Sequence, residues 1–267
     1  MGLRMVLWLA AGVYLLLVAI AVFLSDRMIF QPQRSSYADV PDLIQLTTAD
    51  GTRITALYLP NPGATYTLLF SHGNAEDLGD DRPLLQQLRT AGFSVFAYDY
   101  HGYGTSGGTP SEKTIYSDVE AAYAYLTGTL RVPPERIISF GRSVGTGAAI
   151  ELASRRPIGG LIVQSGFTTA FRVLTHVTLV PFDKFRNIDK ISRVRCPVLV
   201  MHGRADGVIP LGHGLKLFER ANTPKMSLWI EGAGHNDFEL VAGERYFQAI
   251  NEFAKVLGSG KRERAMP

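Results

Sequence analysis

Residues 141–145 read G-R-S-V-G, which is the G-x-S-x-G spacing of a nucleophile elbow with Ser143 at its centre. An apolar stretch, 137–140, precedes the pentapeptide, and a run of small residues typical of an opening helix, 146–154, follows it. A serine at such a strand–turn–helix corner is exposed and conformationally strained, and glycines are required where the strand and the helix pass closely. The pattern alone also fits a serine in an ordinary turn, so the remaining chain must supply its chemical partners.

The first partner that Ser143 needs is a base held by a carboxylate, because a serine hydroxyl is a weak nucleophile at neutral pH. In open α/β sheets such groups follow the carboxyl ends of strands, and elbow enzymes carry them in the chain order Ser, Asp, His. Asp206 closely follows a predicted strand, whereas Asp183 and Asp189 fall inside a long connection. We therefore predict Asp206 as the catalytic acid, with turn capping as its alternative role.

His235 is the predicted catalytic base. It lies in the glycine-rich segment 231–237, E-G-A-G-H-N-D, directly after the last predicted strand. The other histidines fit less well: His72, His101 and His202 precede the acid, His176 lies in the long connection, and His213 begins a helix seven residues after Asp206. Asp237 is expected to cap the final helix rather than to orient His235.

Two backbone N–H groups are predicted to bind the oxyanion of a tetrahedral intermediate, those of Val144 and Asn74. Val144 follows the nucleophile, and Asn74 lies in the loop after the third predicted strand, S-H-G-N-A-E-D at 71–77. The glycine-rich run 102–108 lacks a following lysine and is predicted as a structural loop. The sequence has no H-E-x-x-H, C-x-x-C or P-loop motif, so no metal or cofactor is expected.

The elements that must position these residues alternate between apolar strands and helices after an initial hairpin at Asp50-Gly51. This order predicts an α/β fold, a mostly parallel eight-stranded-type sheet with helices on both faces. Strands are expected at 43–47, 53–59, 67–71, 94–99, 137–140, 161–164, 198–202 and 226–230. Helices are expected at about 82–91, after a capping box at 109–112 with Pro110 in the first position, and at 238–257.

The connection 167–196 is long enough for a short helix and a loop over the site, a short lid rather than a lid domain. Its apolar part, 173–182, fits either the lining of an acyl groove or a helix packed on the sheet.

Residues 5–24 contain no charge and no proline, and 20 helical residues span about 30 Å, the thickness of a hydrocarbon core. A signal-anchor helix is favoured over a cleaved signal peptide, because residues 22–24 continue the apolar run past the possible cleavage site at 19–21. Positive flanking charges are nearly balanced, and we expect a single pass with the catalytic domain on the extracytoplasmic side. The predicted organisation is a tip at 1–4, the transmembrane helix at 5–24, a linker at 25–41, the catalytic domain at 42–258 and a basic tail at 259–267.

Composition adds two restrictions. The 267 residues are 46% hydrophobic with a net charge of +3 and no long basic stripe, so no nucleic-acid partner is expected. Cys196 is the only cysteine, which excludes an intramolecular disulfide.

The combined motifs at 71–74, 99–104, 141–145, 202–206 and 234–237 resemble the α/β-hydrolase superfamily. More narrowly, they resemble its minimal-lid branch, related to serine aminopeptidase-type hydrolases and protein depalmitoylases, some with one N-terminal membrane helix. The resemblance covers about residues 40–257 and implies Ser143, Asp206 and His235 as the triad. His101 departs from it, since many relatives carry arginine there.

This resemblance implies a membrane-anchored serine hydrolase that cleaves carboxylic ester or thioester bonds through an acyl-enzyme. Its substrate would be a small molecule or an acylated molecule, with the bilayer contacted through 5–24. One alternative is an aminopeptidase-like peptidase, which needs a carboxylate to bind the substrate ammonium; the candidates are Glu76, Asp77, Asp80 and Asp81. These four side chains equally suit the start of the next helix. The other alternative is a non-catalytic binding scaffold, which a missing triad member would favour.

Overall fold

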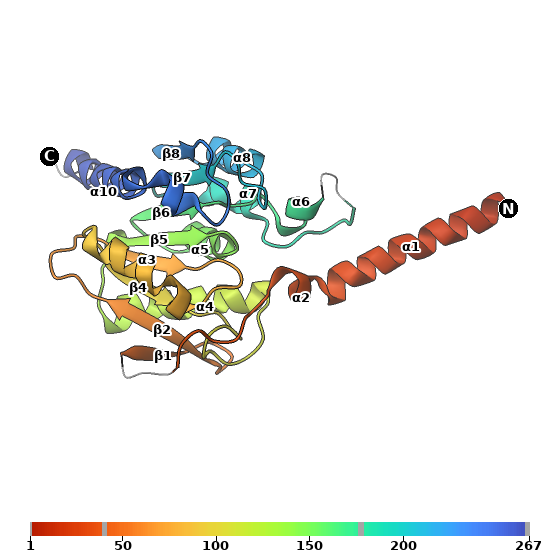
Figure 1. Ribbon diagram of the computed structural model, residues 1–267, viewed down its shortest axis with the longest axis horizontal. Helices are drawn as coiled ribbons and strands as arrows, with labels where there is room; N and C mark the ends of the chain where they lie inside the picture. The colour runs from red at the N-terminus through yellow and green to blue at the C-terminus, as the bar shows by residue number, and fades with distance from the viewer. Residues whose placement is uncertain (1, 39–41, 176–178, 265–267) are drawn as a thin grey trace.

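The computed structural model describes residues 2–38, 42–175 and 179–264, and its centre is one eight-stranded sheet (Figure 1). The strand order is β1-β2-β4-β3-β5-β6-β7-β8. β2 pairs antiparallel with β1 and β4, and all other neighbours are parallel. The strands span Leu43–Thr47, Arg53–Leu59, Thr67–Ser71, Ser94–Tyr98, Ile137–Arg142, Gly160–Gln164, Val198–Gly203 and Lys225–Ile230. The predicted fold class is confirmed.

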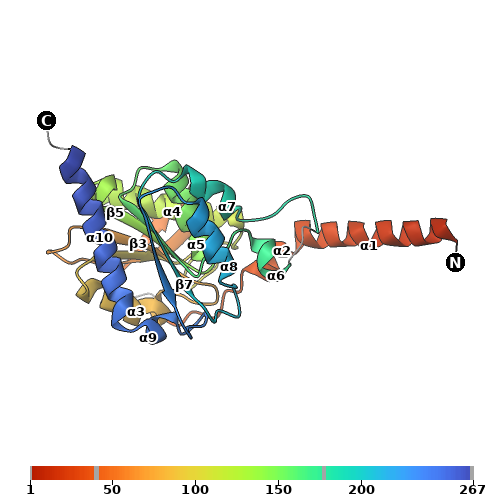
Figure 2. The same ribbon diagram turned by 90° about the horizontal axis from the view of Figure 1, so that it is seen from above.

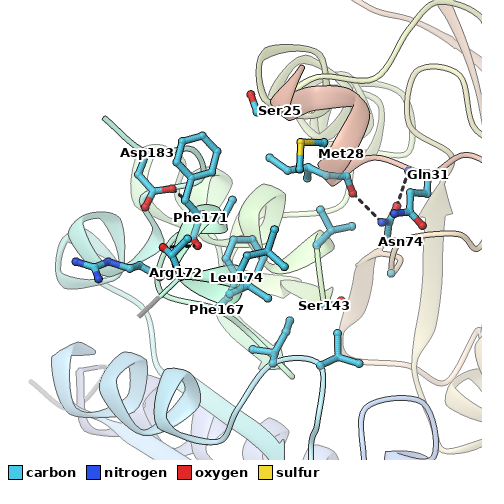
Figure 3. Close-up of a pocket in the computed structure, with 18 of the residues that line it drawn as sticks. Ser25, Met28, Gln31, Asn74, Ser143, Phe167, Phe171, Arg172, Leu174 and Asp183 are labelled. Atoms are coloured by element: carbon cyan, nitrogen blue, oxygen red, sulfur yellow. Dashed lines mark hydrogen bonds between the residues drawn. The ribbon is translucent and has the colours of Figure 1, made fainter. Parts of the chain in front are cut away.

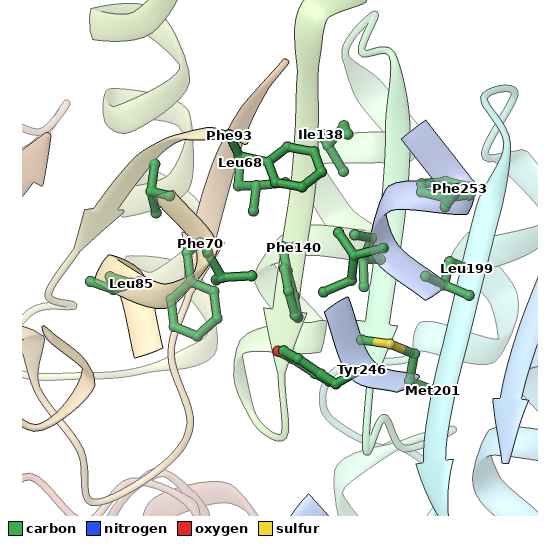
Figure 4. Packing of buried hydrophobic residues seen from close by; sticks show 14 of the residues in the cluster. Leu68, Phe70, Leu85, Phe93, Ile138, Phe140, Leu199, Met201, Tyr246 and Phe253 are labelled. Atoms are coloured by element: carbon green, nitrogen blue, oxygen red, sulfur yellow. The ribbon is translucent and has the colours of Figure 1, made fainter. Parts of the chain in front are cut away.

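Helices cover both faces of the sheet (Figure 2). One face carries α3 (Leu78–Thr90) and α10 (Glu244–Arg264), and the other carries α4 (Glu112–Ala124), α5 (Gly145–Arg155) and α8 (Gly212–Arg220). Under α3 and α10, Phe70, Phe140 and Leu199 of the sheet pack with Tyr246 and Phe253 (Figure 4). Burial on both faces explains why the central strands are continuous apolar runs.

Helix ends differ from those predicted because local caps override the expected start and stop signals. The helix expected from 82 begins at Leu78, since the Asp77 side chain accepts hydrogen bonds from the amides of Gly79 and Asp80. The capping box lies at Ser111 and Thr114, two residues later than expected, so Pro110 precedes the helix. The last helix is two helices, α9 (Phe238–Ala242) and α10, separated by Gly243 at a φ of 55°. The backbone of α10 continues to Arg264, through most of the expected tail.

The helix α1 (Leu3–Phe23) projects away from the domain as a rod (Figures 1 and 2). Its 21 residues are long and apolar enough to cross a membrane. Four further short helices are α2 (Ser25–Ile29), α6 (Ala170–Leu174), α7 (Asn187–Lys190) and α9, given above. The predicted lid connection thus contains two of them; His176, Val177 and Thr178 lie outside the described residues.

The predicted linker 25–41 is, in its described part, packed against the domain rather than extended between two bodies. Phe30 is 3% exposed, and its ring contacts that of Phe185 at 5.9 Å. The Tyr37 hydroxyl donates to Asp99, and Ser36 donates to Asp77. Aromatic rings and hydroxyls that find buried partners therefore fix this segment, which its polar, turn-rich composition did not indicate.

Candidate active site

The turn between β5 and α5 holds Ser143 in the left-handed region, at a φ of 51°. A Cβ on Gly145 would lie 2.1 Å from the Ser71 carbonyl oxygen, and one on Gly141 would lie 2.5 Å from the Gly145 carbonyl oxygen. Only glycine permits strand and helix to approach this closely. The sequence therefore forms a tight corner that presents the Ser143 hydroxyl at the carboxyl edge of the sheet.

Three predicted side chains from distant segments form one chain of hydrogen bonds at this edge. Ser143 Oγ lies 2.9 Å from His235 Nε2, and His235 Nδ1 lies 2.8 Å from Asp206 Oδ2. Ser143 follows β5, Asp206 follows β7, and His235 follows β8. With Nδ1 donating to the carboxylate, Nε2 is free to accept the hydroxyl proton, which is the arrangement that general-base activation of a serine requires.

Asp206 is buried and held from several sides. Its Oδ1 accepts the amides of Val208 at 2.9 Å and Ile209 at 2.7 Å, and His202 Nε2 lies 3.4 Å from Oδ2. Burial raises the pKa of Asp206, but hydrogen bonds from His202, His235 and the Ile209 amide outweigh burial and hold this pKa well below its usual range. Asp206 is therefore a carboxylate at neutral pH and accepts the hydrogen bond from His235 Nδ1.

The other candidate acids and histidines have different partners. Asp183 accepts from Thr169 at 2.6 Å, and Asp189 pairs with Arg186 at 2.5 Å. His213 Nδ1 contacts Thr168 Oγ1 at 3.0 Å. The expectation that the Asp237 side chain caps the final helix is wrong: it makes no cap hydrogen bond and instead accepts the Gly234 amide at 2.7 Å. Asp237 thereby closes the turn that carries His235.

The two predicted oxyanion donors, Val144 and Asn74, line the same cavity as Ser143. Within the described ranges, neither backbone N–H makes a hydrogen bond to another residue. The loop that carries Asn74 is tightly turned: the Gly73 amide donates to Glu76 Oε2 at 2.9 Å, and Ala75 has a φ of 58°. The assignment of the two N–H groups as oxyanion donors stays a prediction.

Arg142 is a site residue that the sequence analysis missed. Its guanidinium pairs with Glu76, with Asp81 at 3.0 Å and with Glu239 at 3.2 Å, and Arg142 directly precedes Ser143 in the chain. Burial raises the pKa of Asp81 to about 7, against the opposing charge of Arg142. A charged side chain at the end of a buried strand was the available signal, because such a group needs buried partners.

Among the described residues, one group of side chains is spaced closely enough to hold a metal ion: His72, Glu76 and Asp81. Arg142 already supplies a cation to Glu76 and Asp81 there. Burial lowers the pKa of His72, but hydrogen bonding and charge from Asp99 outweigh burial and raise it. These contacts give no support for a metal at this position.

His101 holds the 99–108 loop rather than the active site. Its Nδ1 lies 2.5 Å from Asp118 Oδ1, its amide donates to the other Asp118 oxygen at 3.0 Å, and its Nε2 lies 3.3 Å from Asp50. The residue that departs from the superfamily pattern therefore joins this loop to α4 and to the first hairpin.

A cavity of about 580 Å³ adjoins Ser143 and His235 (Figure 3). Besides the residues around Ser143, three segments line it: the end of α1 with Leu17, Ile20 and Ala21, α2 with Ser25, Met28 and Ile29, and the lid with Phe171, Leu174, Leu179 and Val180. The lining is mainly apolar, with polar groups both near Ser143 and on the side of Ser25, Arg172 and Asp183 (Figure 3). The lid stretch from the sequence analysis, in its described residues, thus contributes to this cavity.

Sequence comparison places the chain among known hydrolases. Residues 63–181 match the family described as serine aminopeptidase, S33. Alpha/beta hydrolase domain-containing protein 17B from Homo sapiens is 42% identical over 234 residues, which are 86% of this chain and 80% of that protein. The 17C protein from Xenopus laevis is 41% identical over 240 residues, 88% of this chain and 76% of that protein.

Solved structures show the same fold. The Pyrococcus furiosus esterase Pf2001 superposes with a TM-score of 0.71 at 22% identity, covering 86% of this chain and 97% of that one. The Paleococcus ferrophilus monoacylglycerol lipase gives a TM-score of 0.59 at 22% identity, covering 77% and 98%.

Proposed function

The chain belongs to the α/β-hydrolase family that contains the alpha/beta hydrolase domain-containing 17 proteins, and on that basis we propose a membrane-anchored serine hydrolase that cleaves carboxylic esters or thioesters. One observation carries the proposal: the hydrogen-bonded series from Ser143 through His235 to Asp206, at the base of an apolar cavity. In this proposal Ser143 is the nucleophile, His235 the general base and Asp206 the group that orients His235.

The proposed reaction proceeds in two halves. Ser143 Oγ attacks the substrate carbonyl carbon while His235 Nε2 takes the hydroxyl proton, and the N–H groups of Val144 and Asn74 bind the oxyanion. The intermediate then expels the alcohol or thiol, to which His235 returns the proton, and leaves an acyl group on Ser143. Water activated by His235 hydrolyses that ester and restores the enzyme.

An acyl substrate is supported by the lining of the cavity. Leu174 is 75% exposed and Leu179 is 48% exposed, and both face the cavity at the lid. Burying such side chains against an acyl chain contributes about 0.8 kcal/mol per methylene group removed from water. Because the cavity also borders α1, a substrate held in a bilayer would have its acyl chain close to the nucleophile.

An aminopeptidase would need a carboxylate that is available to bind the substrate ammonium, and the cavity gives little support for one. The carboxylates that line the cavity, in the part of the chain that the structure describes, are Glu76, Asp183 and Glu239. Glu76 and Glu239 pair with Arg142, and Asp183 accepts from Thr169 and from the Phe171 amide. Asp81 is likewise paired with Arg142, and Asp77 caps α3. Binding a substrate ammonium would require breaking one of these contacts, so an uncharged acyl group is favoured.

We propose α1 as the anchor, with a single pass and the catalytic domain on the extracytoplasmic side. The length and composition of α1 support the span. A C-terminal reporter tested for protease access in intact cells measures the orientation: cleavage of the reporter supports it, and protection contradicts it.

The activity is tested on the full chain in detergent micelles, since residues 25–38 pack on the domain. We expect the wild type to hydrolyse p-nitrophenyl esters and acyl thioesters. Ser143→Ala should lower the rate by about 10³-fold or more and abolish labelling by a fluorophosphonate probe. Equal labelling of Ser143→Ala and the wild type would contradict the proposal. Turnover of aminoacyl nitroanilides without ester hydrolysis would instead favour the peptidase alternative.

The acyl preference is tested with esters of graded chain length. We predict that Leu174→Ser lowers kcat/KM for esters of 12–16 carbons by about 3- to 10-fold and leaves that for acetyl esters unchanged, because apolar contact along the chain is lost. Leu215→Ser is the matched control, since Leu215 is also an exposed leucine but lies on α8, outside the cavity lining. An equal loss for short and long esters would contradict acyl binding at the lid.

A further inference from the structure

We infer that residues 25–31, the connecting segment between α1 and the catalytic domain, are a positioning part of the active site. Their backbone holds the Asn74 side chain and thereby orients the Asn74 N–H toward the oxyanion. The inference rests on the proposed serine hydrolase activity, and it adds a role for the segment beyond joining the anchor to the domain.

The Asn74 side chain is held by this segment, as Figure 3 shows, and also by one tyrosine. Asn74 Nδ2 donates to the Ile29 carbonyl at 2.7 Å, and Asn74 Oδ1 accepts the Gln31 amide at 3.0 Å. The Tyr103 hydroxyl donates to the same Oδ1 at 2.6 Å and accepts from the Gln31 amide at 3.1 Å. The Nδ2 and Oδ1 atoms of the Asn74 side chain thus both bind residues outside the 71–77 loop, and these bonds fix the orientation of the side-chain amide.

The connecting segment is itself fixed to the domain, so that it can hold Asn74 in place. Phe30 is buried against Phe185, and Asp26 pairs with Lys184 of the lid connection at 2.5 Å. Tyr103 is 1% exposed and packs at 5.5 Å from the Tyr100 ring. The contacts to Asn74 therefore come from the buried Tyr103 and from a partly exposed segment that the buried Phe30 and the Asp26–Lys184 ion pair attach to the domain.

The oxyanion loop needs such outside contacts because its own conformation is unfavourable. Ala75 has a φ of 58°, a region that costs roughly 1–3 kcal/mol for a residue other than glycine. Oxyanion donors act only when held within about 0.5 Å of the productive position. Since the Asn74 N–H bonds to no described residue, the side chain of Asn74 carries the hydrogen bonds that determine where this N–H points.

The role is one of positioning, not of substrate contact. Asn74 Nδ2 donates one of its two N–H groups to the Ile29 carbonyl, and Oδ1 accepts from Gln31 and Tyr103, so we assign the side chain to positioning the loop. The backbone N–H of residue 74 persists in any variant except proline. Truncating the side chain therefore removes the support of the donor and keeps the donor itself.

The test uses the full chain in micelles with p-nitrophenyl butyrate, whose short acyl group needs little of the cavity. We expect Asn74→Ala to lower kcat about 10-fold or more, with KM changed less than twofold, because a misplaced donor is lost mainly in the transition state. The affinity for a trifluoromethyl ketone, which forms an oxyanion on Ser143, falls by the same factor as kcat/KM. Asn61→Ala is the matched control: Asn61 Nδ2 also donates to a backbone carbonyl, that of Arg89 at 3.0 Å, in a turn outside the cavity lining.

Two further variants each remove one of the groups that donate to Asn74 Oδ1, and they test the inference if Asn74→Ala folds poorly. Gln31→Pro deletes the Gln31 N–H, and Phe30 already has the extended conformation that a residue before proline adopts, with φ −98° and ψ 128°. Tyr103→Phe deletes the hydroxyl. We expect each to lower kcat about 2- to 5-fold with KM unchanged.

The inference is overturned if folded Asn74→Ala, or both single-donor variants, keep kcat within twofold of the wild type. It is also overturned if Asn61→Ala loses as much kcat as Asn74→Ala, since a general loss of stability would then explain both. A wild type without Ser143-dependent turnover would refute the proposed function and the inference with it, and this result is distinct from an active wild type with unaffected variants.

Discussion

The two carboxylate oxygens of Asp206 have different partners, and these partners determine how the side chain of an Asp206→Asn variant would be oriented. Oδ1 accepts two backbone amides, whereas Oδ2 accepts from His235 Nδ1. An asparagine would keep its oxygen toward the amides and turn its NH₂ toward His235. His235 would then accept at Nδ1 and carry its proton on Nε2, the tautomer that is unable to take the Ser143 proton.

We therefore predict that Asp206→Asn lowers kcat by about 10³- to 10⁴-fold in ester hydrolysis. The thermal unfolding midpoint falls as well, because the lowered pKa of Asp206 means that its charged form stabilises the fold, but the variant stays folded at the assay temperature. The measurement compares turnover and thermal unfolding of Asp206→Asn with those of the wild type. A variant that keeps more than a tenth of the wild-type kcat would contradict the assigned role of Asp206.

Residue types and spacing selected Ser143, Asp206 and His235, because each follows an apolar strand and parallel strands bring their carboxyl ends to one edge. The structure brings these three together, and their roles remain part of the proposed mechanism. Arg142 and Asp237 were beyond such reasoning. Arg142 contacts carboxylates 61 and 97 positions away, a juxtaposition that only the folded chain creates. The Asp237 contact to Gly234 depends on a turn geometry that composition does not specify.

The corner between β5 and α5 makes a prediction at the scale of elements. We predict that Gly145→Ala lowers the free energy of unfolding by about 2–3 kcal/mol or prevents folding, because the new Cβ would lie 2.1 Å from a backbone oxygen of Ser71 that cannot move independently of β3. Gly128→Ala is the matched control: Gly128 also lies in a helical segment, and a Cβ there meets no atom within 4 Å. Urea unfolding of the two variants is the measurement, and an equal effect of both substitutions would contradict the steric argument.

Strands were predictable from the sequence and helix ends were not, and the difference has a physical cause. A buried strand needs an uninterrupted apolar run, so its position can be read directly from residues such as 67–71 and 198–202. A helix end depends on which side chain reaches a free amide. Asp77 and Ser111 take that role here, and the glycine at 243 divides a periodic apolar pattern that continues on both sides of it.

At the scale of the whole molecule, residues 25–38 connect α1, the loop that carries Asn74 and the sheet. The sequence offered a polar, turn-rich stretch that suggested a free linker. In the structure the buried Phe30 and the partly buried Tyr37 attach this stretch to the domain, and α1 and the domain both line the cavity. Such packing could not be predicted, because isolated aromatic residues in a polar stretch occur equally in exposed linkers.

His101 links the 99–108 loop, α4 and the first hairpin, and its charge therefore affects the stability of the whole domain. The hydrogen bond to Asp118 raises the pKa of His101 above the ordinary value of 6.5, although burial opposes the shift. The protonated form thus contributes stability that is fully present below pH 6.5 and is lost as pH rises through the higher folded pKa. The pKa of His213 shifts in the opposite direction: burial, followed by the charge of Lys216, lowers it. The fold therefore prefers neutral His213, and this contribution to stability is lost as pH falls below 6.5.

We accordingly predict that the stability difference between the wild type and His101→Gln is largest below pH 6.5 and shrinks as pH rises through the raised pKa of folded His101, because the imidazolium that Asp118 holds loses its proton. His213→Gln serves as a control of opposite sign, with a difference that shrinks as pH falls below 6.5. Urea unfolding in micelles at pH values from below to above 6.5 measures both. If the free energy of unfolding of the wild type exceeds that of His101→Gln by an amount that stays constant or grows with rising pH, the contact of His101 with Asp118 does not depend on a charged imidazole. In that case His101→Arg, which keeps a positive charge at every pH, would give no gain at alkaline pH.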